Sequence, residues 1–142
     1  MSGLSDIVAA TREEADAIDL ASPEPLADAV LANSVDPVKL GQLEGILTGA
    51  TFTEILGNIT AGYRRSVDDE TWLVGIRPQL VDALAAFGST QARDLAARWA
   101  STDEWRLDGG TAQDLEPLVA ALIRLAGEAQ VAGRDLYLLM RP

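Results

Sequence analysis

Residues 98–111 read RWASTDEWRLDGGT, and they bring together residue types that could carry chemistry or bind a partner. Trp105 lies among three acids, Asp103, Glu104 and Asp108. Carboxyl groups close to one another and to an apolar ring can have raised pKa values, as a general acid requires. Spacing alone does not place these side chains in a pocket. Tryptophan is also a common anchor at protein interfaces, and acids beside it suit a basic partner. We therefore predict a partner-binding patch here and no catalytic centre.

Trp105 has a second interpretation, in which its ring fills the base of the core where helices meet. Trp99 belongs to the buried stripe of the preceding helix, because Ala92, Leu95 and Trp99 recur at the helical period. Trp105 falls outside this stripe, yet aromatic side chains are more often buried than exposed. The sequence leaves both interpretations of Trp105 open, whereas the double glycine at 109–110 indicates a turn.

A second acidic cluster consists of Asp68, Asp69 and Glu70. Hard cations such as Mg²⁺ and Ca²⁺ prefer oxygen ligands of this kind. Adjacent residues in a loop do not converge by default, however, and the stretch lacks the spaced ligands and fixed glycine of a calcium loop. Internal pairing with Arg64 and Arg65 in a solvated loop explains the cluster better. We predict no metal site and no cofactor.

The composition excludes several classes of activity. The chain contains neither cysteine nor histidine, and its 22 acids against 11 bases give a net charge of -11. Disulfides, zinc sites built from Cys and His, and the usual base of hydrolytic triads are therefore absent. The negative charge repels nucleic-acid phosphates and anionic membranes, so the partner we expect is a basic protein. The alternative is that acidity only keeps the protein soluble.

The length of 142 residues matches a single domain over 1–142. The N-terminal stretch MSGLSDIVAA lacks the basic segment and long apolar run of a secretory signal, and the apolar segment 118–127 is interrupted by Arg124. We expect no membrane association and a cytoplasmic location.

Caps and hydrophobic periodicity predict the elements that position these residues. Thr11 with Glu14 forms a capping-box pattern, and Asp36 before Pro37 is a typical helix start. The pattern predicts helices over 12–20, 37–48, 52–60, 78–87, a stretch carrying Trp99, and 113–132 before Gly133, one helical turn around 26–32, and strands over 5–10, 71–76 and 135–140. The predicted class is α+β, with five or six helices and a small sheet of about three short strands from the N-terminal, central and C-terminal segments. The long helix should cover at least one face of that sheet.

Three glycines, Gly41, Gly45 and Gly49, recur every four residues along the helix predicted over 37–48. An interior glycine costs about 1 kcal/mol relative to alanine, and close approach by another element can offset that cost. We favour internal packing of this glycine face over a partner surface.

The order of these features resembles the YfbM-like family of small uncharacterised bacterial proteins. The resemblance is carried by the strand and EEA helix near the start, DPVKLGQLEGILTG at 36–49, WLVGIRPQLVDALAAF at 72–87, and DLEPLVAALIRLAGEAQVAGRDLYLLM at 114–140. It implies this fold and a partner-binding role, because some YfbM-like domains are associated with bacterial toxin systems as candidate immunity proteins. No catalytic residue carries over. The chain departs from the family in the short RLDGGT segment and in the extra glycines of the helix ending in LTG.

Three functions follow in order of preference. The first is a non-catalytic acidic protein-binding domain, most concretely an immunity-type inhibitor of a toxin. The alternative is a small-ligand-binding domain or a carboxylate-dependent enzyme with a pocket near Trp72, Trp99 and Trp105. The third is a nucleic-acid mimic, which needs a dense acidic face, whereas the acids here are scattered between basic residues.

Overall fold

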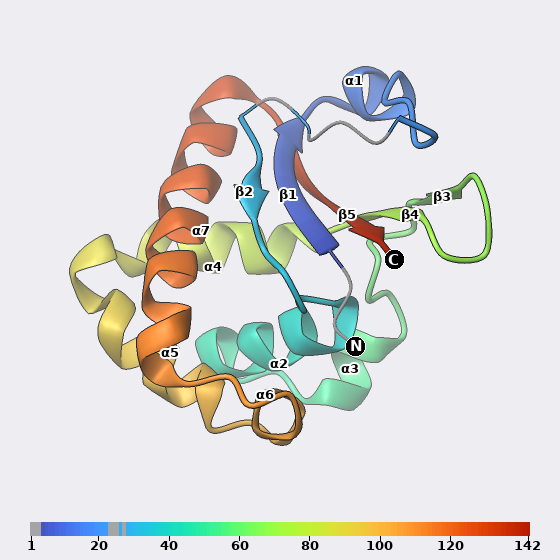
Figure 1. The fold of residues 1–142 in the computed structure, drawn as a ribbon. Coiled ribbons are helices and arrows are strands. Elements are labelled where there is room, and N and C mark those ends of the chain that lie inside the picture. Colours follow the sequence, from blue (N-terminus) through green and yellow to red (C-terminus); the bar gives the residue numbers. More distant parts are fainter. Residues whose placement is uncertain (1–3, 23–25, 27) are drawn as a thin grey trace.

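The structure is a computed structural model that describes residues 4–22, 26 and 28–142. Figure 1 shows a sheet with most of its helices gathered on one side. The strands are β1 (Leu4–Ala10), β2 (Val30–Leu31), β3 (Arg64–Ser66), β4 (Trp72–Gly75) and β5 (Asp135–Arg141). The α-helices are α1 (Arg12–Asp16), α2 (Pro37–Thr48), α3 (Phe52–Leu56), α4 (Pro78–Phe87), α5 (Ala92–Ala100), α6 (Asp103–Leu107) and α7 (Ala112–Ala132), with a 3₁₀ turn η1 (Ser89–Gln91) before α5.

The α+β class is as predicted, but the small three-stranded sheet is wrong. The described residues form seven α-helices and a five-stranded antiparallel sheet. The missed strands β2 and β3 have two and three residues, too few for an alternating pattern to be recognised. The stretch around 26–32, predicted as a helical turn, contains β2 instead, and Ala27 lies outside the described residues. The helices predicted over 12–20 and 52–60 end early, at Asp16 and Leu56.

The sheet has the order β2-β1-β5-β4-β3, and every pairing is antiparallel. The three predicted strands are therefore direct neighbours in its centre. Strands β1 and β5 pair along their whole length, from Leu4 opposite Arg141 to Ala10 opposite Asp135. The short strands β2 and β3 form the two edges. Because side chains alternate along each strand, the pairing register decides which residues share a face.

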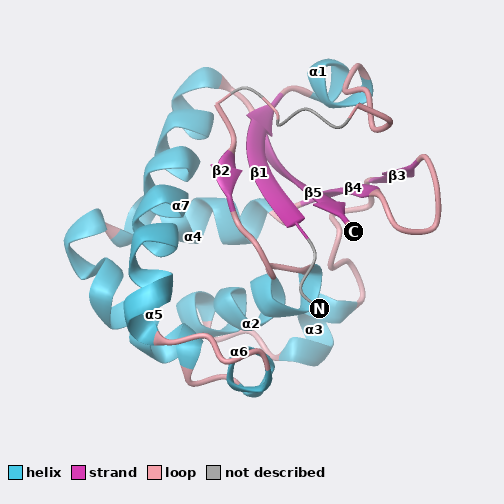
Figure 2. Ribbon diagram, viewed as in Figure 1, coloured by secondary structure: helices cyan, strands magenta, loops and turns pink. Residues whose placement is uncertain are grey.

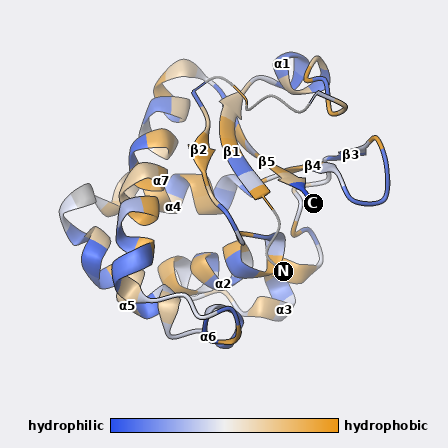
Figure 3. Ribbon diagram, viewed as in Figure 1, coloured by the Kyte–Doolittle hydropathy of each residue, from blue (hydrophilic) through white to orange (hydrophobic). Residues whose placement is uncertain are grey.

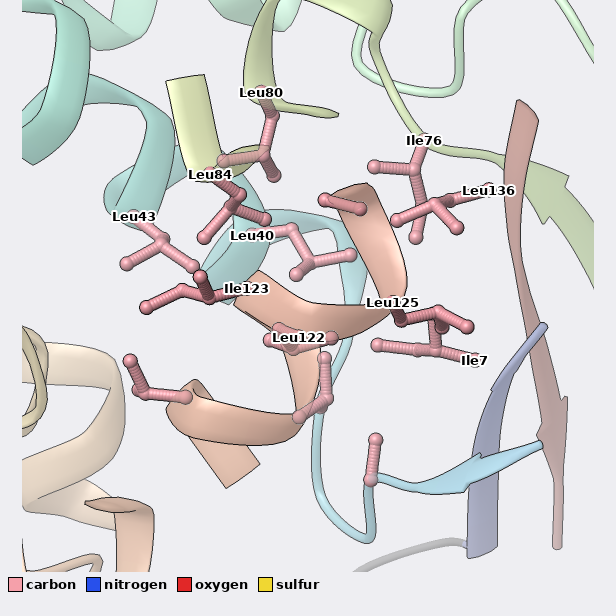
Figure 4. Close-up of a cluster of buried hydrophobic side chains, with 14 of the residues drawn as sticks. Ile7, Leu40, Leu43, Ile76, Leu80, Leu84, Leu122, Ile123, Leu125 and Leu136 are labelled. Carbon is pink, nitrogen blue, oxygen red and sulfur yellow. The ribbon is translucent and has the colours of Figure 1, made fainter. Parts of the chain in front are cut away.

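One face of the sheet is covered by helices, and the main core lies between them (Figure 2). Ile7 and Leu136 project from the strands toward α7, whose Leu122 and Leu125 lie in the middle of this core (Figure 4). Side chains of α2 and α4, such as Leu84, close the other side. As predicted, α7 is the central core helix.

The opposite face carries a smaller apolar cluster. Val8, Leu73 and Tyr137 from the strands pack with Ala15 of α1 and with Leu20 just beyond it. The helix α1 has five residues, so it covers only part of this face. The two faces therefore differ in how completely they are covered.

The glycine face of α2 packs against another helix at Gly41, whereas Gly45 is half-buried and Gly49 is exposed. A Cβ on Gly41 would lie 3.0 Å from Cε1 of Phe52 in α3, so the glycine allows the two helices to approach closely. Gly49 has φ 77° and ends α2 as its C-cap. At the other end Asp36 accepts a 2.8 Å hydrogen bond from the Lys39 amide, which confirms the predicted N-cap.

Candidate interaction surface

At the centre of the patch predicted around Trp105, the tryptophan ring is buried in the core. The Trp105 side chain lies on α6 and is 4% exposed, and its ring meets that of Trp99 edge-on with centroids 5.3 Å apart. Gly110 lies so close that a Cβ there would be 2.5 Å from the Trp105 ring. Asp103 is exposed and Glu104 is half-buried on the same short helix. Only the acidic part of the predicted patch reaches the surface.

A buried lysine, which the sequence reasoning missed, organises this region. Lys39 is the chain's lone lysine and is 2% exposed. Its Nζ lies 4.2 Å from the centroid of the Trp105 ring, donates to the carbonyl of Ser34, and forms an ion pair with Asp108. Asp108 is thereby committed to an internal partner. A single lysine in a helix gives no sequence signal of burial, and its partner is far away along the chain.

Hydrogen bonding divides the two tryptophans. Trp99 Nε1 donates to the Lys39 carbonyl at 2.8 Å, so this fully buried ring is also satisfied. Trp105 Nε1 is buried with no hydrogen-bond partner among the described residues. The periodicity correctly placed Trp99 in the core, and Trp105 lies there as well.

The predicted pocket near the tryptophans has no counterpart in the hollows described by the structure. Trp72 is half-buried on the sheet, with the Arg64 guanidinium 5.1 Å from its ring centroid. A hollow of about 640 Å³ lies elsewhere, between β1, the C-terminal half of α7 and the chain after α1. Its lining includes Ile18 and Leu125 and the ion pair of Glu14 with Arg134, at 3.1 Å.

A polar network fixes α1 on the less covered face. Tyr63 donates from its hydroxyl to Asp16 at 2.8 Å and accepts from Nε of Arg65 at 3.1 Å. Arg65 also donates to the carbonyls of Ala15 and Ile18, where α1 ends. Burial of Tyr63 raises the pKa of its phenol, and the bond to Asp16 raises it further. These groups are engaged with one another, so they are a structural clamp.

The same face is open at the end farthest from α1. Leu4, Leu31 and Val67 are 57%, 71% and 52% exposed there. A hollow of about 390 Å³ lies beside them, lined by Leu4, Leu20, Ala21, Ser22, Val67, Asp68, Thr71, Arg141 and Pro142. We call this region, comprising the three exposed apolar residues and the hollow, the open end of the sheet.

Acidic residues lie beside the open end in the β3–β4 turn and just before the lining segment 20–22, and others lie farther away along α1 on the same face. Four acids against one base occupy residues 12–19, and three acids with no base occupy the β3–β4 turn at 67–71. Figure 3 shows both segments as largely hydrophilic, and the hollow brings the chain after α1 and this turn together. Asp68 accepts hydrogen bonds from the amides of Glu70 and Thr71, which lower the pKa of its carboxyl. The expected pairing of this turn with Arg64 and Arg65 is absent from the described contacts, since Arg64 lies over Trp72 and Arg65 holds α1.

Among the described residues, no group of three or more acidic side chains is arranged to hold a metal ion. Among those residues, the helices are also too short or too polar to cross a membrane.

The elements together define an α+β domain with one helix-covered and one partly open sheet face. Comparison of the chain with protein-family models, curated proteins and solved structures finds no match. The YfbM-like resemblance therefore stays a prediction from the sequence.

Proposed function

We propose that this chain is a non-catalytic, acidic protein-binding domain of the cytoplasm whose partner is a basic protein. The position of its charges carries the proposal. Acids of the α1 segment and of the β3–β4 turn are exposed on the same side of the sheet. Of the bases near them, Arg12 and Arg64 are exposed and lie over the rings of Tyr63 and Trp72, whereas Arg65 and Arg141 are engaged within the fold. Arg65 donates to carbonyls of the α1 segment, and Arg141 pairs with Asp6 at 3.2 Å. Uncompensated negative charge attracts a basic partner and accelerates its association.

The most concrete form of this proposal is an immunity-type inhibitor of a bacterial toxin. The YfbM-like resemblance supports that form, because it implies partner binding linked to toxin systems. The lack of cysteine and histidine supports a binding role over hydrolytic chemistry. A nucleic-acid mimic is less well supported, because exposed Arg93, Arg98 and Arg124 interrupt the acids on the helical side.

The test is co-expression of the tagged protein with the products of the genes adjoining its own. We expect one of them to copurify in a stoichiometric complex and to be basic. Its association rate should fall about tenfold or more between low and physiological salt, because steering by charge is screened. Absence of a stoichiometric partner, or an association rate that does not change with salt, would contradict the proposal.

One observation favours a second function, the binding of a small molecule. The 640 Å³ hollow beside α7 lies within the size range of about 300–1,000 Å³ typical of ligand pockets. Thermal unfolding measured across a metabolite panel tests this function. A ligand that raises the melting temperature of the wild type should lose its effect in Ala132→Phe, because Ala132 is an exposed lining residue whose enlargement fills the hollow. Equal stabilisation of both proteins would place the ligand elsewhere.

A further inference from the structure

The exposed apolar side chains of the open end form a strip across the sheet. Leu31 of β2 lies opposite Asp6 of β1, and Leu4 comes two residues before Asp6, on the same face. Such diagonal neighbours in an antiparallel pair are about 7–8 Å apart. Leu4 belongs to β1, and Val67 follows the edge strand β3, yet both residues line the same hollow. The apolar strip therefore runs from the β2 edge to the turn after β3.

The hollow in this strip is shallow, with two buried residues in its lining and a basic group that is paired. Leu20 and Thr71 are buried in its lining. Arg141 contributes the basic group of the lining, and its Nη2 lies 3.2 Å from Oδ2 of Asp6, with both side chains largely buried. This pair leaves little net charge within the hollow itself. An apolar side chain suits such a space better than a charged one, because a charge would have to lose its water without a partner.

The rim of the hollow is negatively charged. Asp68 lies in the lining, and the exposed Asp69 and Glu70 follow it in the turn. Asp19 lies just before the lining segment 20–22. Of the two bases of β3, Arg65 faces this side of the sheet but donates to the carbonyls of Ala15 and Ile18, and Arg64 lies over Trp72 on the other face. Charge complementarity thus selects basic groups around a central apolar one.

We propose, building on the protein-binding function above, that the open end is the docking surface and takes a basic protein segment. The segment inserts one apolar side chain between Leu4 and Val67, and its Lys or Arg side chains flank that residue and face Asp69 and Glu70. A side chain that fills a central pocket, with surrounding contacts that exclude water, is the usual arrangement of a binding hot spot. A second copy of this chain fits poorly, because its net charge of -11 would repel the acidic rim.

The probe is a pair of synthetic peptides, Ac-Lys-Arg-Leu-Lys-Arg-NH₂ and the same peptide with serine in place of leucine. Both are titrated at low salt into the ¹⁵N-labelled full chain, and amide shifts are followed by NMR. We expect the largest shifts for the leucine peptide at residues 4–6, 20–22, 67–71 and 139–141. The serine peptide should bind about fivefold more weakly, because it has no apolar anchor.

Two sets of variants separate the apolar and charged contributions. Leu4→Ser with Val67→Ser should abolish the preference for leucine, whereas Val131→Ser, at a site 92% exposed on α7, should preserve it. Asp69→Asn with Glu70→Gln should weaken both peptides about fivefold, as two lost exposed charge contacts imply. Asp103→Asn is the matched control at a distant exposed acid and should change little. Circular dichroism checks that each variant is folded.

Shifts centred on α6 or α7, equal binding of both peptides, or no binding of either would overturn this docking surface. The protein-binding function would survive those results if the adjoining gene product still copurifies. The protein-binding function itself is refuted by a different result, the absence of a stoichiometric partner in the co-expression experiment.

Discussion

The two faces of the sheet are built by different means. The covered face carries a continuous apolar core to which α2, α4, α5 and α7 contribute, and it includes Trp99 and the central helix α7. The other face has a smaller cluster, one five-residue helix, and a network of Tyr63, Arg65 and Asp16 that holds this helix in place. The contrast shows that most of the stabilising core can lie on one face of a sheet while the other face stays partly open to contacts.

The largest expected effect tests the covered face. Trp99→Ala should lower the free energy of unfolding by about 4 kcal/mol, because it removes a fully buried ring and its hydrogen bond. Leu20→Ala on the other face should cost about 2 kcal/mol, since Leu20 belongs to the smaller cluster. Urea denaturation measures both values. Equal costs would remove the distinction between the faces.

The Lys39–Asp108 pair should respond asymmetrically to mutation. Asp108→Ala leaves a buried ammonium group without its counter-charge and should cost about 3 kcal/mol. Lys39→Met should cost about 1 kcal/mol, because a side chain of similar shape still covers Trp105 and the 47% exposed Asp108 can return to water. When Lys39→Met is combined with Asp108→Ala, the loss in free energy of unfolding should be no larger than in Lys39→Met alone. A larger cost for Lys39→Met than for Asp108→Ala would refute this explanation of the pair.

Two glycines give matched tests of packing around the covered face. Gly110→Ala should destabilise by about 2 kcal/mol, because the new Cβ would overlap the rigid Trp105 ring. Gly127→Ala should stabilise by about 0.5–1 kcal/mol, since nothing lies within 4 Å of a Cβ at this position inside α7. Thermal or urea unfolding distinguishes the opposite signs.

On the less covered face, Tyr63→Phe should cost about 1 kcal/mol, because Asp16 and Arg65 both lose a hydrogen-bond partner. The pKa of Tyr63 is raised in the folded protein above its ordinary value of 10.0. The contribution of its neutral phenol is therefore fully present below pH 10 and is lost as the pH rises through the folded pKa. Wild-type stability should fall toward that of the Tyr63→Phe variant only at strongly alkaline pH. Hydrogen exchange of the α1 amides should rise in Tyr63→Phe while exchange in α7 stays unchanged.

The smallest effect concerns the turn beside the open end. Folding lowers the pKa of Asp68 from its ordinary value of 3.8, so the ionised carboxylate contributes stability above that pH. This contribution is lost as the pH falls through the lower, folded value. The stability difference between wild type and Asp68→Ala should accordingly shrink below about pH 3.8. A difference independent of pH across the acid range would show that the carboxylate charge does not hold the turn.

Elements with strong local signals were predictable from the sequence. The capping box of Thr11 with Glu14 is present, with both hydrogen bonds formed. Asp36 and Pro37 begin α2, and Gly133 ends α7 with φ 68°. These features depend on a few neighbouring residues, so one sequence suffices to recognise them.

Features that depend on distant residues were not predictable. Strand β3 is a polar Arg-Arg-Ser segment whose only strand signal is its pairing with β4. The contact of Lys39 with Asp108 joins residues far apart in the chain, and so does the ion pair of Arg77 with the buried Glu44. The predicted patch had the same difficulty. The helix α6 that carries Trp105 has five residues, too few for a helical period to show that Trp105 is buried. The exposed strip of the open end is formed by β1, β2 and the β3–β4 turn, which are far apart in the sequence.

The central position of β5 also governs the order in which this molecule can assemble. Residues 135–141 are translated after every other described element, yet both β1 and β4 need them as a partner. Helices α4 to α7 can meet through contacts that are local in sequence, which form quickly. The nascent chain on the ribosome must meanwhile keep β1 without its main partner, and unpaired apolar strands aggregate readily. The sheet can therefore be completed only after β5 has been synthesised and has paired with β1 and β4. Chaperones that shield β1 until then should raise the yield of folded protein.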